Sequence, residues 1–320
     1  MPLTTDERLL ALSRETIETF DKANGGVHPG FRPAHAKGIL LTGTFTPSPA
    51  AASLTRAPHA HRASTPITVR FSNAAGVASV PDYDPRASPR GMAIRFHLAE
   101  HVHTDIIGQS HDGFAVRTPE EFLEFLQAAA ASGPDAPKPA PIEKFLSTHP
   151  KALAFVTAPK PIPVSFATES FFAVNAYKFI SGEGGIHFGR YRIRPEAGNQ
   201  HLDDAAAAAK TPNFLFDEIA DRINHGPVKY RILVQVAADG DIVDDSTEHW
   251  PESRPQVEFG VIELTKPVEN DAAEQRHIVF DAIPRVDGIE SSGDPILEAR
   301  SSIYLMTGRR HRNSPPSSRV

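Results

Sequence analysis

The chain has 320 residues, of which 40% are hydrophobic and 22% are charged, a balance typical of a soluble globular protein with one large domain or two closely packed ones. The formal net charge is -6 and the Lys and Arg residues are dispersed, so we expect no nucleic-acid binding. Cysteine is absent, which excludes disulfides, thiolate haem ligation, cysteine-zinc sites and a cysteine peroxidase mechanism. Redox chemistry would therefore require a cofactor.

The N-terminal residues predict an amphipathic helix, because hydrophobic residues recur near the helical period before a pair of glycines stops the helix. The hydrophobic positions are Leu9, Leu10, Leu12, Ile17 and Phe20. We interpret residues 1–26 as an N-terminal arm helix. The segment is acidic and has no long apolar core, so it does not resemble a secretory signal, and no apolar run is long enough to span a bilayer. We therefore expect a cytoplasmic protein that does not associate with membranes.

Short β-rich runs follow this helix and are separated by Pro, Gly and Asp. The runs cover residues 39–45, 67–71 and 92–97. They predict strands of a barrel or a meander. Thr118 then begins a predicted helix, because this capping residue is followed by Pro119 at the first helical position and by Glu121 three residues after the cap.

The second half of the chain is also rich in strands. Residues 132–141 hold too many prolines for regular structure, so we expect a linker or surface loop there. Further β-like runs cover residues 171–179, 189–193, 229–236 and 257–264. The glycines in residues 182–185 lie between two such runs and lack the third spaced glycine of a dinucleotide loop, so they predict a hairpin turn.

Strands thus dominate two separated halves of the chain, with helices before, between and after them. Strands and helices do not alternate regularly, as they would in a parallel sheet. The sequence therefore favours an α+β fold around an antiparallel β-barrel, with flanking helices and the N-terminal helical arm. Residues 27–312 form the main domain, and the basic, apolar-poor residues 313–320 are expected to be a flexible tail.

Arg300 and Tyr304 carry the strongest chemical signal in the chain. They are four residues apart, and residues at this spacing share one face of a helix. The guanidinium of Arg300 can then lie beside the phenol of Tyr304 and favour the phenolate, which is the form that binds ferric iron. Tyrosine is an unusual ligand for iron, so the pair is informative.

His35 is a candidate acid–base residue. Breaking the oxygen–oxygen bond of a peroxide needs a neutral imidazole that takes a proton from one oxygen and delivers it to the other, although a single His is more often a core or strand-end residue. Arg70 could form a forked pair with a carboxylate or a salt bridge on a sheet surface. Ser72 could hold one imidazole nitrogen of His35 or be a solvated strand hydroxyl. These residues alone leave the alternatives open.

In their order along the chain, these segments resemble the catalase superfamily. The matching stretches are residues 32–38, 69–72, 89–96, 288–294 and 299–304. The likeness extends from about residue 20 to residue 312. Within the superfamily, the chain is most similar to the short catalase-related haem peroxidases, or minimal catalases. That closer similarity rests on residues 165–179, 189–195 and 250–255.

The resemblance implies that residues 27–312 are a catalase-like domain that binds haem b, and catalase is a known haem protein with a tyrosine ligand to the iron. It implies Tyr304 as the iron ligand. The implied catalytic residues are His35, Ser72 and Ser110, and the implied cofactor-binding residues are Arg32, Arg70, Phe114, Arg300 and Arg312. Arg70 would pair with a haem propionate, and Phe114 would lie over the haem unless it is an ordinary core residue.

Two departures from the family pattern bear on function. Where catalases carry Gly-Asn-Asn, this chain has Gly followed by Gln109 and Ser110, so the amide that helps to position a second peroxide is moved or replaced. Arg312 falls one residue later than the family's propionate-pairing Arg, which leaves Arg309 and His311 as competitors for that role.

The expected function is that of a haem-dependent peroxidase. It would reduce hydrogen peroxide or organic hydroperoxides with small organic reductants, and its catalase activity would be weak because dismutation needs a second peroxide. We expect a homodimer. Two alternatives stay open, a haem enzyme that rearranges fatty-acid hydroperoxides and a non-catalytic haem- or metal-binding protein. The pairs His59/His61 and His101/His103 could bind a metal on one face of a strand, but neither has a fixed carboxylate partner in the sequence.

Overall fold

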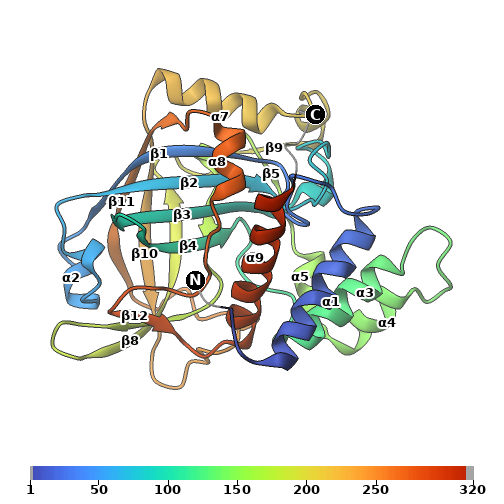
Figure 1. Cartoon of the computed structure of the whole chain (residues 1–320), viewed down its shortest axis with the longest axis horizontal. Coiled ribbons are helices and arrows are strands. Elements are labelled where there is room, and N and C mark those ends of the chain that lie inside the picture. Colours follow the sequence, from blue (N-terminus) through green and yellow to red (C-terminus); the bar gives the residue numbers. More distant parts are fainter. Residues whose placement is uncertain (1–2, 315–320) are drawn as a thin grey trace.

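Eight antiparallel strands close into a barrel (Figure 1). The computed structural model describes residues 3–314. The strand order around the barrel is β10-β11-β1-β2-β3-β4-β6-β8, and pairing of β8 with β10 closes the ring. The bounds are β1 Gly38–Pro47, β2 Thr65–Asn73, β3 Arg90–Ala99, β4 Val102–Gln109, β6 Phe171–Phe172, β8 Ile186–Pro195, β10 Val228–Val236 and β11 Gln256–Pro267. The antiparallel barrel predicted from the sequence is confirmed.

Four further strands lie outside the ring. Two of them, β7 Tyr177–Ile180 and β12 Ile289–Ser291, extend the sheet from β8. The others, β5 Ile162–Pro163 and β9 His201–Leu202, pair with each other in a separate small sheet.

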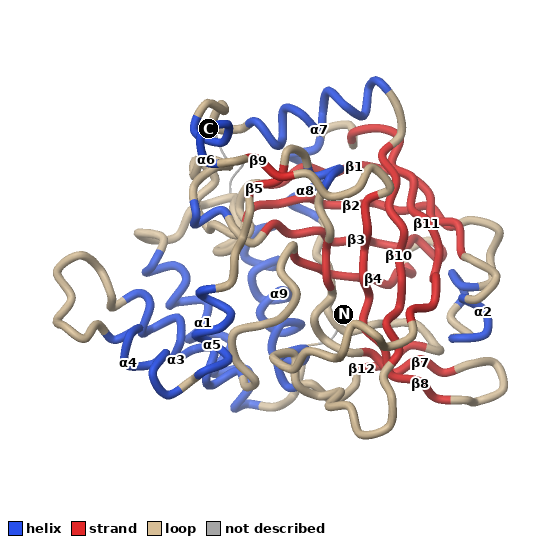
Figure 2. The backbone as a smooth tube through the Cα atoms, turned by 180° about the vertical axis from the view of Figure 1, so that it is seen from behind, coloured by secondary structure: helices blue, strands red, loops and turns tan. Residues whose placement is uncertain are grey.

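Helices flank the barrel and extend beyond it on one side (Figures 1 and 2). They are α1 Glu7–Ala23, α2 Ala51–Leu54, α3 Pro119–Ala130, α4 Pro141–Thr148, α5 Pro150–Thr157, α6 Asp204–Ala208, α7 Phe214–His225, α8 Asp271–His277 and α9 Pro295–Asn313, with 3-10 turns at Pro58–Ala60, Pro85–Ala87 and Phe166–Thr168. Helix α9 packs against α1, α3 and α8, and lies between the barrel and the group formed by α1, α3, α4 and α5. None of the described helices is long and apolar enough to cross a membrane.

Local sequence signals set several of these boundaries. The helix predicted within residues 1–26 forms as α1 and packs against α3 and α9. The helix predicted at Thr118 forms as α3, and Thr118 and Glu121 make reciprocal capping hydrogen bonds of 3.2 Å. The backbone N–H of Ser181 donates to the carbonyl of Gly185 in the turn of the β7–β8 hairpin. These three predictions are confirmed.

One predicted strand is interrupted. The sequence predicts a continuous run over residues 171–179, but the structure has the two short strands β6 and β7 there. Between them, Asn175 is fully buried, and its side chain bonds with Arg300 and Asp294 of the α9 region. Hydrophobic periodicity reports which residues are buried, but it does not report that the chain leaves the sheet to make a contact distant in sequence.

The barrel interior is filled by hydrophobic side chains. Phe71 on β2 stacks on Phe166, with ring centroids 5.0 Å apart. Side chains alternate between the two faces of a strand, so Arg70 and Ser72, the neighbours of this inward residue, point out of the barrel into a cavity beside α9. Because packed interiors leave few voids, the space for a ligand lies between the outer face of the barrel and the helices.

His59 is a buried core residue that makes the stability of the fold sensitive to acid. It is 1% exposed and packs among the rings of three core phenylalanines. Burial, with smaller effects of Arg62 and His61, lowers the pKa of His59 to about 3. An unfolded chain, in which the His pKa is about 6.5, binds this proton more readily. Folding stability therefore falls as the pH falls from about 6.5 toward about 3.

We expect His59→Leu to remove this contribution. Between about pH 6 and 4, the free energy of unfolding should fall by about 1.4 kcal/mol less per pH unit than it does in the parent protein. Urea unfolding of the cofactor-free protein at several pH values measures the slope. His225→Leu, at an exposed position of α7, is the matched control and should keep the parental slope. A parental slope in His59→Leu would show that the buried imidazole is not neutral.

Candidate active site

A cavity of about 240 Å³ lies between the barrel wall and α9. Its barrel side is built by the loop before β1 and by β2, β3 and β4, and its helical side is built by α1, α3 and α9. Seven of the nine site residues predicted from the sequence line it. They are Arg32, His35, Arg70, Ser72, Phe114, Arg300 and Tyr304. Most of the remaining lining is apolar.

His35 is held on the barrel side of the cavity. Its φ of 56° lies in the left-handed region, which costs energy for a residue with a Cβ. Its Nδ1 lies 3.0 Å from the Oγ of Ser72 on β2. Gly91 on β3 packs against this pair, and a Cβ there would lie 2.6 Å from the Ser72 hydroxyl and 2.9 Å from Nδ1 of His35. The predicted pairing is present, and it leaves Nε2 of His35 for a ligand.

The surroundings of His35 keep its imidazole neutral. Burial is the main cause that lowers the pKa of His35 to about 3, and the cations of Arg70, Arg300 and Arg32 lower it further. The ring is therefore uncharged between about pH 5 and 8. A neutral imidazole can accept a proton, which is what the acid–base role requires.

Tyr304 faces the cavity from α9. Arg300 lies one turn earlier on the same face, and its Nε donates to the Tyr304 hydroxyl oxygen over 3.0 Å. Burial opposes the charge of Arg300, but the oxygens of Tyr304 and Tyr177 and the carboxylate of Asp294 outweigh it and raise the pKa of Arg300. The helix thus places a permanent cation beside the phenol oxygen, as the spacing of the two residues predicts.

Asn175 and Asp294 hold the guanidinium of Arg300 in place, and neither residue has a role predicted from the sequence. Arg300 donates through Nη1 to Oδ1 of Asn175, whose Nδ2 donates to Asp294 over 2.7 Å. Asp294 also caps α9, because its carboxylate accepts from the backbone N–H of Ile296 over 2.9 Å. Asp followed by Pro can be recognised in the sequence as the start of a helix. The contact with Asn175 spans 119 residues and has no local signal.

Arg70, which is buried, and Arg32, which is partly buried, form a cationic end of the cavity. Arg70 donates to the side chain of Gln275 and to the carbonyl of His35, each over 2.9 Å, and Arg32 donates to the carbonyl of Ile278 over 2.8 Å. Burial lowers the pKa of Arg32 to about 10, and burial with the adjacent Arg32 lowers the pKa of Arg70. Within residues 3–314, neither has an ion pair with a carboxylate. Buried charges need partners, so this end fits an anionic group.

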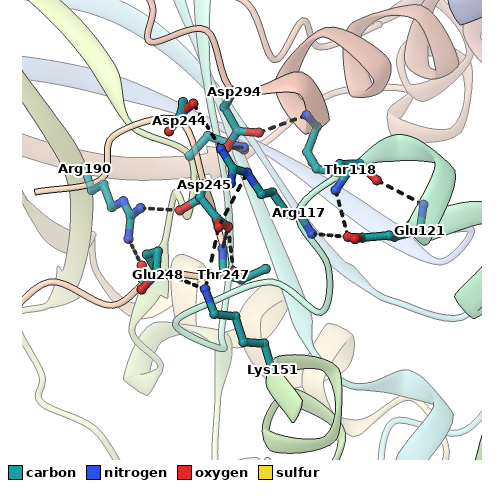
Figure 3. A network of polar contacts seen from close by, with 12 residues as sticks. Arg117, Thr118, Glu121, Lys151, Arg190, Asp244, Asp245, Thr247, Glu248 and Asp294 are labelled. Carbon is teal, nitrogen blue, oxygen red and sulfur yellow. Dashed lines mark hydrogen bonds and ion pairs between the residues drawn. The ribbon is translucent and has the colours of Figure 1, made fainter. Parts of the chain in front are cut away.

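Phe114 lines the cavity, and its backbone is bonded to a loop that belongs to the polar network around Asp245 (Figure 3). Its backbone N–H donates over 3.2 Å to the carbonyl of the residue after Asp245. The carboxylate of Asp245 accepts from the hydroxyl of Thr247 over 2.6 Å and lies 3.6 Å from Lys151 and 3.8 Å from Arg117. These contacts hold the loop against which Phe114 is positioned.

Ser110 does not reach the cavity, which contradicts its predicted catalytic role. Its hydroxyl accepts a hydrogen bond from the backbone N–H of Arg90 over 2.9 Å. The preceding residue, Gln109, lines the cavity instead, and its Nε2 donates to the carbonyl of Gly113 over 2.7 Å. Successive side chains of an extended chain point to opposite sides, so only one of these two neighbours can face the ligand.

Arg312 does not line the cavity, so the structure gives no support to the prediction that it binds the cofactor. Its side chain is exposed, whereas His311 is only 6% exposed. Seven residues make about two turns of an α-helix, so His311 lies on the same face of α9 as Tyr304. One residue further, Arg312 is rotated away by about 100°.

The structure does not place either histidine pair on one strand face. Within residues 3–314, no group of three or more His, Asp or Glu residues is placed to hold a metal ion. His59 lies in a 3-10 turn and is buried in the core. His101 is exposed in the turn between β3 and β4, with a φ of 60°. The strand face expected for each pair is therefore absent.

Comparisons with known proteins agree with this geometry. The family described as Catalase matches residues 12–318. A catalase-related peroxidase of Mycolicibacterium paratuberculosis is 35% identical over 290 residues, which cover 88% of this chain and 90% of that protein. A catalase-related peroxidase of Synechococcus elongatus is 32% identical over 88% of this chain and 84% of its own length.

Solved catalase structures share the fold. A fungal catalase superposes with a TM-score of 0.79 and 22% identity over 89% of this chain, and this chain spans 59% of that one. A bacterial catalase superposes with a TM-score of 0.78 and 22% identity over 100% of this chain, which spans 65% of its length. The barrel, the tyrosine-bearing helix and the matched sequence together define a class: the chain belongs to the catalase family. It is an oxidoreductase that acts on peroxide, similar over most of its length to the two catalase-related peroxidases.

Proposed function

We propose that this protein is a haem b peroxidase that reduces hydrogen peroxide or organic hydroperoxides with small organic donors and dismutates hydrogen peroxide only weakly. One observation carries the proposal: a neutral His35 held by Ser72 and an arginine-paired Tyr304 line one buried cavity. When bound, the haem iron supplies the redox chemistry of oxygen–oxygen bond cleavage.

The residues around the cavity fit a haem. The phenol of Tyr304 is the ligand that catalase-type haem requires, and the apolar lining suits the macrocycle. The unpaired cations of Arg32 and Arg70 match the two propionate carboxylates in charge. Gly38 leaves room for the guanidinium of Arg70, because a Cβ there would lie 2.3 Å from Nη2 of Arg70.

His35 moves the proton of the peroxide. Its Nε2 would take the proton from one peroxide oxygen and return it to the departing oxygen. For Nε2 to accept, the ring proton must be on Nδ1, where it is donated to the Ser72 hydroxyl at 3.0 Å. The Ser72 hydroxyl can accept this hydrogen bond, and the contact holds the plane of the ring.

Arg300 stabilises negative charge on the phenol oxygen of Tyr304. Its Nε–H donates to that oxygen, and a charge-assisted hydrogen bond to an anionic acceptor is about twice as strong as a neutral one. Asn175 and Asp294 fix the guanidinium, so the cation needs no reorganisation when the oxygen carries negative charge.

The position of the Gln109 side chain explains why dismutation of hydrogen peroxide would be weak. A second peroxide would need a free amide donor in the cavity, but Nε2 of Gln109 already donates to the carbonyl of Gly113 over 2.7 Å. Oxidation of an organic donor does not require that amide. The engaged side chain therefore favours peroxidase over catalase turnover.

We expect Gln109→Asn to raise the rate of hydrogen peroxide dismutation by about threefold to tenfold, the value of one additional hydrogen bond. The shorter side chain cannot reach the Gly113 carbonyl as Gln does, so its amide stays free in the cavity. Oxygen evolution and dye oxidation by the same haem-loaded preparation give the ratio of the two activities. Gln109→Leu, which has no amide, is the control and should leave dismutation at or below the parental rate. A gain in both variants would assign the effect to cavity size instead.

A visible spectrum of the purified, haem-supplemented protein tests the proposed function. A high-spin ferric spectrum with a tyrosinate ligand should change on addition of peroxide and return when an organic donor is added. Protein that takes up no haem would overturn the proposal at Tyr304. Product analysis with a lipid hydroperoxide separates reduction, which yields the alcohol, from rearrangement of the hydroperoxide.

A further inference from the structure

Two histidines lie side by side on the outer face of the β3–β4 hairpin. His97 on β3 and His103 on β4 are direct partners in the antiparallel pairing. Side chains at directly opposite positions share one face of a sheet, with Cβ atoms about 4.5–5.5 Å apart. Phe96 and Leu98, the neighbours of His97 in β3, point into the core, so both imidazoles point outward, and they line one pocket there.

A hydroxyl group from β2 holds the ring of His97. Oγ1 of Thr68 lies 2.9 Å from Nε2 of His97. This contact uses one ring nitrogen, so Nδ1 is available on the side of the pocket. A histidine that binds a metal ion usually donates its other N–H to an oxygen atom, which fixes the tautomer and the plane of the ring. Thr68 is placed to accept that N–H from His97.

The charges next to the two imidazoles are balanced. Arg95, the next outward residue of β3, donates to the carboxylate of Asp105 over 2.9 and 2.8 Å, so the nearest cation has its own counter-charge. Asp105 also accepts from the backbone N–H of Asp281 over 2.8 Å. Burial, followed by the effect of Arg95, lowers the pKa of His97 and of His103. Both rings are therefore neutral at neutral pH, and neutral imidazole is the form that binds a metal ion.

We propose that His97 and His103 together bind a divalent transition-metal ion that prefers nitrogen ligands, of the class of Zn²⁺, Cu²⁺ and Ni²⁺, with water completing the coordination. Imidazole suits these ions, whereas Mg²⁺ and Ca²⁺ prefer oxygen ligands. Within residues 3–314, no group of three or more His, Asp or Glu residues is placed to hold a metal ion. The site therefore has two protein ligands, and we expect weaker binding than at a site with three or four.

This site is separate from the cavity of the proposed peroxidase. Among the described residues, that cavity is lined by neither histidine and not by Thr68. An ion held by both strands would fasten β3 to β4. Further along the same outer face, the paired residues Ala93 and Ile107 reach the cavity. A ligand that binds only the folded chain stabilises it by mass action, so Zn²⁺ should raise the melting temperature of the purified protein.

Calorimetric titration of the purified, untagged protein with zinc chloride tests this proposal. His97→Gln and His103→Gln should each weaken binding by at least about tenfold, the lower end of the loss caused by removing a residue that only supports a ligand. The double variant should bind little more weakly than either single variant, because substitutions at two ligands of one ion are not additive. His225→Gln, at an exposed position of α7, is the matched control and should keep the parental affinity.

His101→Gln separates this site from the pair His101/His103. His101 lines the same pocket, but it is exposed in the turn between the strands, so its substitution should leave the affinity unchanged. With Cu²⁺ as the probe, electron paramagnetic resonance should show hyperfine coupling to two imidazole nitrogens in the parent and to one in His97→Gln.

Three results would overturn the proposal. They are a parent that binds no zinc, parental affinity in folded His97→Gln and His103→Gln proteins, and a loss of binding in His101→Gln but not in His97→Gln. Circular dichroism spectra of the variants establish that they are folded. None of these results bears on the proposed peroxidase, because haem uptake and the reaction with peroxide are measured separately and the two sites share no residue.

Discussion

Tyr304→Phe should lose nearly all capacity to retain haem. The substitution removes one oxygen atom, which is the only ligand to iron that the proposal draws from the protein, and leaves the ring in place. Loss of a residue that only supports a metal ligand commonly weakens binding by about 10-fold to 100-fold, so loss of the ligand itself should exceed that range. The ratio of Soret absorbance to protein absorbance after haem loading and gel filtration measures the effect.

Tyr191→Phe is the matched control for this experiment. Tyr191 is 2% exposed in the barrel core, where it packs against Tyr177, Phe179 and Phe259, and it does not line the cavity described by residues 3–314. The control should load haem as the parent does. A Tyr304→Phe protein with a parental haem content and spectrum would show that another group ligates the iron.

His35→Ala should retain haem and react with peroxide about 10²-fold to 10⁴-fold more slowly, the usual contribution of a general acid–base residue. Among the described residues that line the cavity there is no other histidine and no carboxylate, so the proton has no comparable acceptor. Stopped-flow spectra of the haem-loaded protein give the rate of the first step with peroxide. Because His35 has a φ of 56°, His35→Asn is a useful second variant, since Asn tolerates this backbone conformation better than Ala does.

The pH dependence of the same rate tests whether His35 acts as a neutral base. With the pKa of His35 lowered to about 3, the ring stays neutral between about pH 8 and 5, so protonation of His35 should not slow the reaction in that range. The rate should fall only as the pH approaches about 3. Ser72→Ala should retain haem and slow the reaction less than His35→Ala, because it removes the partner that orients the imidazole ring and leaves the base in place. A parental rate in His35→Ala would reject the acid–base assignment.

The sequence determined the features that depend on short-range geometry. The capping pattern at Thr118 defines the start of α3, and the hydrophobic runs predict the long strands of the barrel. The four-residue spacing of Arg300 and Tyr304 puts their side chains on one helical face. Each of these features is set by the helical or strand period alone.

Only the tertiary structure decided which of two neighbouring residues is turned toward the interior. Gln109 lines the cavity and Ser110 does not, and His311 is buried where Arg312 is exposed. A shift of one residue reverses the face along a strand and turns the side chain by about 100° around a helix, so the assignment depends on how β4 and α9 are packed. The link from Asn175 to Asp294 joins residues 119 positions apart. The sequence determined which side chains were available for the chemistry, and the packing of α9 against the barrel determined which of them meet, because that distance and orientation arise only when elements far apart in the chain come together.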